Sequence, residues 1–139
     1  MAAPIFLADT SVLVHQGRHP AVLERFERLS IDGRLAICQV TALEFLNNAP
    51  SPSSYEKLWT SLQVHRQLDV TTEAMDRALD VHRLLGGASQ HRRFTLPDLI
   101  IAATAELHGA TVLHYDDDYD RIAAVTGQPV EWVAPRGSL

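Results

Sequence analysis

Acidic residues stand at the ends of several apolar segments of this sequence, and their chemistry points to a metal site. Asp9 directly follows the apolar run PIFLA, and Asp116 follows the run ATVLHY. Glu44 and Asp98 lie at the starts of apolar stretches with helical spacing. Carboxylates that a fold brings together repel one another, which raises some of their pKa values or demands a cation. Mg²⁺ and Mn²⁺ prefer carboxylate oxygen and promote phosphodiester hydrolysis. The pattern therefore predicts a metal-dependent nuclease site.

Each acid also has a structural explanation when it is considered alone. Asp9 would cap the segment that follows the first strand. Glu44 lies three residues after Thr41, in the T-x-x-E pattern of a capping box. Asp98 lies in the first turn of a helix, where the helix dipole favours negative charge. The acids of residues 116–120 would form an Asx-turn and a helix cap. It is the combination of the four positions that favours a common site.

The elements that would position these acids alternate between strands and helices. Apolar runs predict strands over residues 4–8, 34–40, 110–115 and 129–134, and helical spacing predicts helices over residues 19–29, 41–46, 55–68, 72–85, 98–108 and 119–127. This alternation predicts an α/β fold with three layers, α/β/α, around a mainly parallel sheet. In such a sheet the carboxyl ends of the strands and the following helix starts share one edge. The acids should meet at that edge.

Length and composition favour one compact domain over residues 1–139, since 46% of the residues are apolar. The single cysteine, Cys38, excludes an intramolecular disulfide and a cysteine-rich zinc site, and we expect a buried, inert thiol. The longest apolar runs are too short to span a bilayer, and the first residues lack the features of a signal peptide. We therefore expect no membrane association and a cytoplasmic protein.

The net charge of −5 excludes a general basic coat for nucleic-acid binding, so any positive surface must be local. One cluster of His15, Arg18 and His19 follows the first strand, and a second of His91, Arg92 and Arg93 precedes Asp98. Basic side chains beside an acidic site would bind the phosphates of a nucleic acid. The pair Arg92 and Arg93 is the candidate for that role.

Four segments in this order and spacing are similar to a known family: ADTSVL, TALEFL, LPDLIIAATA and VLHYDDDYDRIA. They resemble the PIN-domain ribonucleases, most closely the VapC toxins of toxin–antitoxin pairs, and the resemblance covers essentially the whole chain. It implies a PIN-like fold and an endoribonuclease that depends on Mg²⁺ or Mn²⁺. It also implies a VapB-type antitoxin as partner, an RNA substrate and a homodimer.

The resemblance assigns roles to individual residues. It implies that four acids are catalytic, namely Asp9, Glu44, Asp98 and Asp116. Asp9, Asp98 and Asp116 would hold the ion directly, whereas Glu44 and Asp118 would act through water; whether Asp116 or Asp118 is the direct ligand stays open. Ser11 would hydrogen-bond a metal ligand or a substrate phosphate. Asp117 and Asp120 are expected to be solvated turn residues. His114 and Tyr115 stand where the family commonly has a small residue or an arginine.

Other interpretations remain beside this one. A non-catalytic metal-binding or interaction module of the same fold is the main alternative. An aspartyl-phosphate enzyme built on Asp9 is disfavoured, because the only lysine, Lys57, lies far away in an amphipathic helix. A histidine zinc site is also disfavoured, since His82 lies on an apolar helix face. The aromatic residues Phe45, Tyr55 and Trp59 are assigned to the core in preference to a groove for a partner helix.

Overall fold

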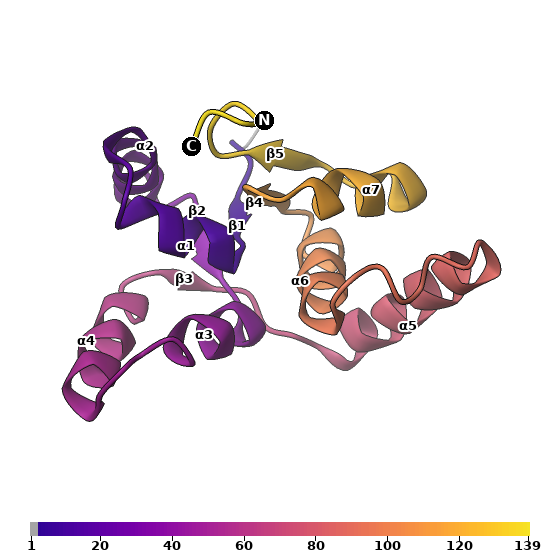
Figure 1. The fold of residues 1–139 in the computed structure, drawn as a ribbon, viewed down its shortest axis with the longest axis horizontal. Helices are drawn as coiled ribbons and strands as arrows, with labels where there is room; N and C mark the ends of the chain where they lie inside the picture. Colours follow the sequence, from indigo (N-terminus) through magenta and orange to yellow (C-terminus); the bar gives the residue numbers. More distant parts are fainter. Residues whose placement is uncertain (1–2) are drawn as a thin grey trace.

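The computed structural model, which describes residues 3–139, contains a five-stranded sheet with helices on both faces (Figure 1). The strand order is β3-β2-β1-β4-β5, and every neighbouring pair is parallel. The strands are β1 Phe6–Ala8, β2 Leu35–Ile37, β3 Arg66–Gln67, β4 Thr111–His114 and β5 Val130–Trp132. The predicted three-layer α/β architecture with a parallel sheet is confirmed.

The central strand β1 has both faces covered, and its alternating side chains separate two apolar cores. Leu7 belongs to one core, whereas Phe6 and Ala8 belong to the other. All three residues are buried, as expected for a parallel strand between two helical layers. Ala8 is aligned with Leu113 of β4, so the carboxyl ends of these two strands lie side by side.

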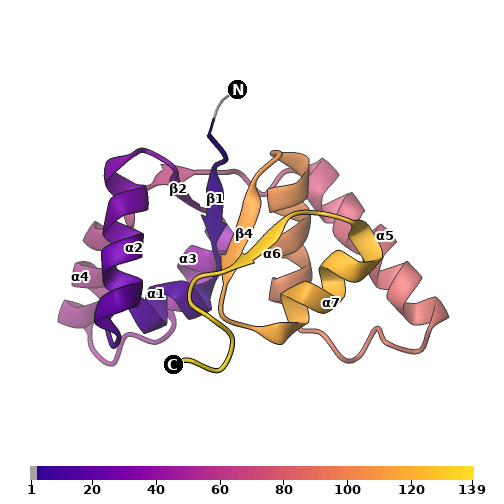
Figure 2. The ribbon, with the colours of Figure 1, turned by 90° about the horizontal axis from the view of Figure 1, so that it is seen from above.

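Helices fill the two outer layers (Figure 2). The first layer contains α1, α2 and α4, whereas the second contains α5, α6 and α7. Helix α3 packs against both α1 and α6 and so connects the layers. The helix bounds are α1 Thr10–Gln16, α2 Pro20–Ile31, α3 Gln39–Leu46, α4 Pro52–Leu62, α5 Thr72–Gly87, α6 Leu96–Leu107 and α7 Asp117–Thr126.

The capping box predicted at Thr41 is wrong. Helix α3 begins two residues earlier, after Cys38, and the Thr41 side chain is fully buried. Its hydroxyl donates a hydrogen bond to the carbonyl of Ala8 at 3.1 Å, which ties α3 to the end of β1. The carboxylate of Glu44 is therefore not a cap. Helix α5 begins at Thr72, where the predicted helix over residues 72–85 starts, and its cap is Thr71.

The acidic segment after β4 is the beginning of a helix and not a separate turn. Asp116 is the N-cap of α7, and its Oδ1 accepts the backbone N–H of Asp118 at 2.9 Å. Asp117 forms an ion pair with Arg136, and Asp120 accepts a hydrogen bond from an indole. The two residues lie in the first turn of a helix and not in a turn, but their side chains stay partly exposed, at 36% for Asp117 and 44% for Asp120.

Two aromatic residues assigned to the core are on the surface. Trp59 is 48% exposed and Tyr55 is 39% exposed, whereas Phe45 packs partly buried against the core. The predicted helix over residues 55–68 begins and ends earlier, because Ser51 caps α4 and the chain turns at Gln63 toward β3. Trp59 lines a groove together with Leu43 of α3 and Gln67 of β3.

Cys38 is a buried free thiol, as predicted. Within residues 3–139, the longest helix is α5, and no helix combines the length and the apolar character that crossing a membrane requires.

Candidate active site

Three carboxylates meet where α6 begins and α7 follows β4. One oxygen each of Asp98, Asp116 and Asp118 lies within 4.8 Å of the others. Asp98 is held in the first turn of α6, where its backbone N–H donates to the cap residue Thr95 at 3.3 Å. Local capping rules thus place Asp98 and Asp116, and the parallel sheet brings their helices together. This cluster is called the acidic trio below.

Asp9 lies beside the acidic trio and not within it. The side chain is buried, and both of its oxygens accept hydrogen bonds. Its Oδ2 accepts from the backbone N–H and the hydroxyl of Ser11, at 3.1 and 2.7 Å. Its Oδ1 accepts from the hydroxyl of Tyr119 at 2.7 Å. Asp9 is therefore a fixed carboxylate one hydroxyl group away from Asp98.

Tyr119 is the bridge between these acids, and the sequence analysis assigned no role to its hydroxyl. The residue is fully buried, and its hydroxyl lies 2.7 Å from Asp9 Oδ1 and 3.2 Å from Asp98 Oδ1. Burial and the two carboxylates raise the pKa of Tyr119 well above its ordinary value. The phenol therefore stays protonated and acts as a donor.

The electrostatics of Asp98 fit a site for a cation. Burial first, and then the negative charge of Asp9, raise the pKa of Asp98 from 3.8 to about 7. Burial and the charge of Asp116 also raise the pKa of Asp118. Carboxylates that are buried beside other negative charges need a proton or a positive ion near neutral pH. The donor set of the acidic trio consists of oxygen alone, which suits a hard divalent ion.

Glu44 reaches the same side of the molecule from α3 but does not join the trio. Its Oε1 accepts a hydrogen bond from the hydroxyl of Thr10 at 2.8 Å. Thr10 directly follows Asp9 in the chain, so the first turn of α1 holds Glu44 on one side and Asp9 on the other. The side chain of Glu44 is only partly buried and remains open to solvent.

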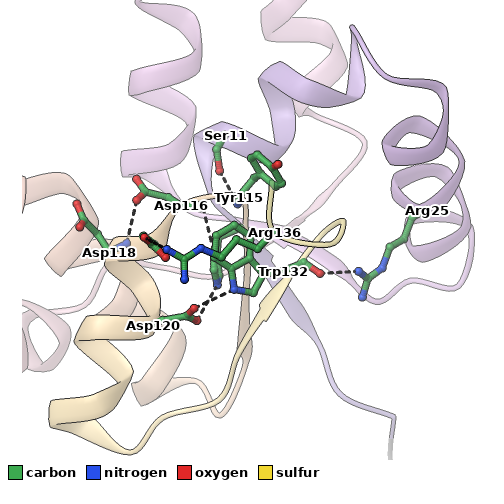
Figure 3. A network of polar contacts seen from close by, with 10 residues as sticks. Ser11, Arg25, Tyr115, Asp116, Asp118, Asp120, Trp132 and Arg136 are labelled. Atoms are coloured by element: carbon green, nitrogen blue, oxygen red, sulfur yellow. Dashed lines mark hydrogen bonds and ion pairs between the residues drawn. The ribbon is translucent and has the colours of Figure 1, made fainter. Parts of the chain in front are cut away.

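Ser11 has both of its hydrogen-bonding functions in use. Its hydroxyl donates to Asp9. The same hydroxyl oxygen accepts the backbone N–H of Tyr115 at 3.0 Å (Figure 3). Ser11 thus connects the end of β1 to the segment that leads to Asp116. This geometry favours the predicted contact with a candidate metal ligand over a contact with substrate.

The predicted phosphate-binding arginines lie between α5 and α6. The Nε of Arg93 is 3.9 Å from Asp118 Oδ1, and its side chain is 41% exposed. Arg92 is exposed next to it. The structure therefore brings Arg93 to the acidic trio, whereas Arg92 stands at the surface of the same loop.

Comparison with known proteins identifies the family of this chain. A family model described as PIN domain matches residues 6–125. The parallel sheet with acids at its carboxyl edge and this match define the class of protein, a PIN domain. The chain belongs to the VapC ribonuclease family. It is 42% identical over 134 residues to Ribonuclease VapC51 of Mycobacterium tuberculosis, covering 96% of each chain. It is 41% identical over 137 residues to Ribonuclease VapC18 of the same species, covering 97% of this chain and 99% of the relative.

Solved structures show the same fold. DNA-bound VapBC from Salmonella typhimurium matches with a TM-score of 0.77 and 19% identity, over 95% of this chain and 100% of the other. VapBC-1 from nontypeable Haemophilus influenzae matches with a TM-score of 0.76 and 16% identity, over 93% and 98% of the two chains. At these identities the likeness concerns the fold alone.

Proposed function

We propose that this protein is a divalent-metal-dependent endoribonuclease that acts in the cytoplasm as the toxin of a type II toxin–antitoxin pair. The observation that carries the proposal is the acidic trio of Asp98, Asp116 and Asp118 beside the buried Asp9. Full-length similarity to proteins named ribonucleases supports RNA as the substrate.

The acidic trio would hold Mg²⁺ or Mn²⁺, with Asp9 as the adjacent acid. When bound, such an ion polarises a phosphate and lowers the pKa of water. Asp98 has a pKa of about 7, so it must lose a proton at neutral pH before its carboxylate can act as a ligand. Tyr119 and Ser11 orient Asp9 through their hydrogen bonds.

Two further side chains would act on the RNA and on the attacking water. Glu44 is open to solvent and is oriented by Thr10, so it would accept a proton from water or orient it. Arg93 would bind a phosphate, and its positive charge beside Asp118 would limit the repulsion between RNA and the acids. The products would carry a 5′-phosphate and a 3′-hydroxyl.

The proposal includes a VapB-type antitoxin and a homodimer. Two apolar grooves support these partners. The first lies between α3, α4 and β3, and it includes the exposed residues Leu43 and Trp59. The second lies between α5 and α6, and it includes the exposed residues Met75, Leu79 and Leu96. Apolar surface of this kind commonly marks protein–protein contacts.

RNA cleavage by the purified protein tests the proposed activity. Cleavage should require Mg²⁺ or Mn²⁺, should stop with EDTA, and should fall at least about 100-fold in Asp9→Ala and Asp98→Ala. Asp76→Ala, which removes an exposed acid from α5, is the matched control and should cleave normally. Undiminished cleavage by both site variants would refute the proposed site.

Two further results bear on the toxin role. Expression without a partner should arrest growth, and harmless accumulation of intact protein would contradict the toxin assignment. A wild-type protein that binds Mn²⁺ but cleaves no RNA would favour the non-catalytic metal-binding module.

A further inference from the structure

His114, the last residue of β4, is a buried histidine to which the proposed chemistry gives no role. Its side chain is fully buried, and its ring centroid lies 5.1 Å from that of Tyr119 and 5.0 Å from that of Trp132. Its Nδ1 accepts the backbone N–H of Asp116 at 3.1 Å. This bond reaches the backbone of an acid of the trio, two residues further along the chain.

The acceptor role of Nδ1 fixes the state of the ring. Nδ1 carries a lone pair, so the proton of the neutral imidazole sits on Nε2. The Nε2 atom is buried and has no hydrogen-bond partner within residues 3–139. Asp120 Oδ1 lies 3.8 Å from it. Asp120 is itself held by the indole N–H of Trp132, which donates to Oδ2 at 2.9 Å (Figure 3). The Nε2–H of His114 therefore lies near a carboxylate that is itself held by a hydrogen bond.

The C-terminal strand holds the other side of this arrangement. Trp132 of β5 is aligned with His114, and the backbone N–H of Val133 donates to the carbonyl of His114 at 2.8 Å. Arg25 of α2 donates to the carbonyl of Trp132 at 2.8 Å. Trp132 and Val133 follow residues 6–125, the range of the PIN-domain match. Part of the support of His114 thus comes from a segment outside that range.

We propose that His114 is a positioning residue for the acidic trio. By accepting the Asp116 backbone N–H, with its ring packed against Trp132 and its Nε2 near Asp120, it sets the position of the Asp116 carboxylate after β4. This inference rests on the proposed metal site. It assigns to that site a residue that orients a ligand and is not itself a ligand. Groups that orient metal ligands commonly change metal affinity by 10- to 100-fold when they are removed.

Titration of the full chain with Mn²⁺ tests the role of the Nδ1 acceptor. His114→Leu removes the acceptor and should weaken Mn²⁺ binding by about 10-fold or more. His114→Asn should restore binding to within about three-fold, because an Asn carbonyl readily accepts the N–H two residues on. His108→Leu, which removes a surface histidine that contacts the Asp69 carbonyl, should bind as wild type. Equal binding by the wild type and His114→Leu, or equal losses in the Leu and Asn variants, would overturn the proposal.

Amide hydrogen exchange in the metal-free protein provides a readout without activity. The Asp116 amide should exchange at least about ten-fold faster in His114→Leu than in the wild type, whereas His114→Asn should retain its protection. Equal exchange in the wild type and His114→Leu would overturn the positioning role, whatever the protein does with Mn²⁺ or RNA. Faster exchange with unchanged Mn²⁺ affinity would also overturn it, because the bond would then serve the fold alone.

A double-mutant cycle tests whether Trp132 acts through His114. Trp132→Phe keeps a ring but removes the donor to Asp120, and it should weaken Mn²⁺ binding by about three-fold. In the His114→Leu background the same change should have no further effect, since coupled residues are not additive. If the two losses of Mn²⁺ affinity add in the double variant, the supporting role assigned to Asp120 and Trp132 is overturned. If His114→Leu does not fold, unchanged Mn²⁺ affinity and unchanged Asp116 exchange in Trp132→Phe would overturn the proposal.

Discussion

The acids at the carboxyl edge of the sheet form two halves, the first with Asp9 and Glu44 and the second with the acidic trio. The two halves differ in how their negative charge is satisfied. In the first half, Asp9 and Glu44 accept hydrogen bonds from hydroxyl and amide donors of neighbouring residues. In the second half, Asp98 and Asp118 have raised pKa values and lie within 4.8 Å of Asp116. The first half is thus oriented by hydrogen bonds of the protein itself, whereas in the second half the nearby Arg93 does not offset the combined negative charge.

This difference separates the roles of acids that look equivalent in the sequence. The resemblance assigned Asp9 and Asp98 alike as direct ligands. In the structure Asp98 belongs to the cluster that needs a cation, and Asp9 is connected to it through the Tyr119 hydroxyl. The second half should therefore respond most strongly to protons and metal ions, and the first half to the loss of its hydrogen bonds.

The largest expected effect is that of pH on the metal-free protein. Because the folded state raises the pKa of Asp98 from 3.8 to about 7, it binds this proton more tightly than the unfolded state does. The resulting stability is complete below about pH 4 and is lost as the pH rises through about 7, by on the order of 4 kcal/mol. Urea unfolding in EDTA should show that the free energy of unfolding of the wild type falls from pH 5 to pH 8. This fall should be absent in Asp98→Asn. The same pH dependence in both proteins would contradict this assignment.

In the first half, replacing the acid by asparagine should change the free energy of unfolding in the opposite direction to the same replacement at Asp98. Asp9→Asn should lower the free energy of unfolding at pH 8 by about 1.5–3 kcal/mol, because a charged acceptor of three hydrogen bonds is weakened. Under the same conditions Asp98→Asn should be stabilising. Asp76→Asn controls for the loss of an exposed acid. If both site variants change stability in the same direction, the distinction between the halves fails.

The bridge between the halves should have an intermediate effect. Tyr119→Phe removes the hydroxyl that serves Asp9 and Asp98 and should cost about 2 kcal/mol in the free energy of unfolding. It should also raise the pKa of Asp98 further, because the lost hydrogen bond opposed the shift. Denaturant unfolding and NMR titration of the Asp98 carboxyl measure the two effects. A carboxyl that titrates as in the wild type would exclude the bridge.

The smallest effect is expected at the partly buried Glu44. Thr10→Val removes the hydroxyl that orients this carboxylate and should cost about 0.5–1 kcal/mol. Thr10→Ser keeps the donor and should recover most of the loss. Cleavage by Thr10→Val should fall less than cleavage by Asp98→Ala. A larger fall in Thr10→Val would mean that Glu44 contributes more than the acidic trio.

The sequence allowed prediction of the parts that depend on local signals. Buried parallel strands form continuous apolar runs, and acids at helix starts follow capping rules, so Asp98 and Asp116 could be placed at one edge. The Tyr119 bridge could not be predicted, because its partner Asp9 lies 110 positions away. Thr41 fitted a capping pattern, but its hydroxyl binds a carbonyl 33 positions away. Tertiary contacts decided these cases, and local sequence does not contain them.

Calorimetric titration of Mn²⁺ in two buffers with different ionisation enthalpies tests the central claim most directly. If the acidic trio holds the ion, binding at pH 6.5 should release between about half and one proton from Asp98, and binding at pH 8.5 should release almost none. Asp98→Ala should lose both the binding and the release. Mn²⁺ binding that is unchanged in Asp98→Ala, or that releases no proton at either pH, would contradict the account.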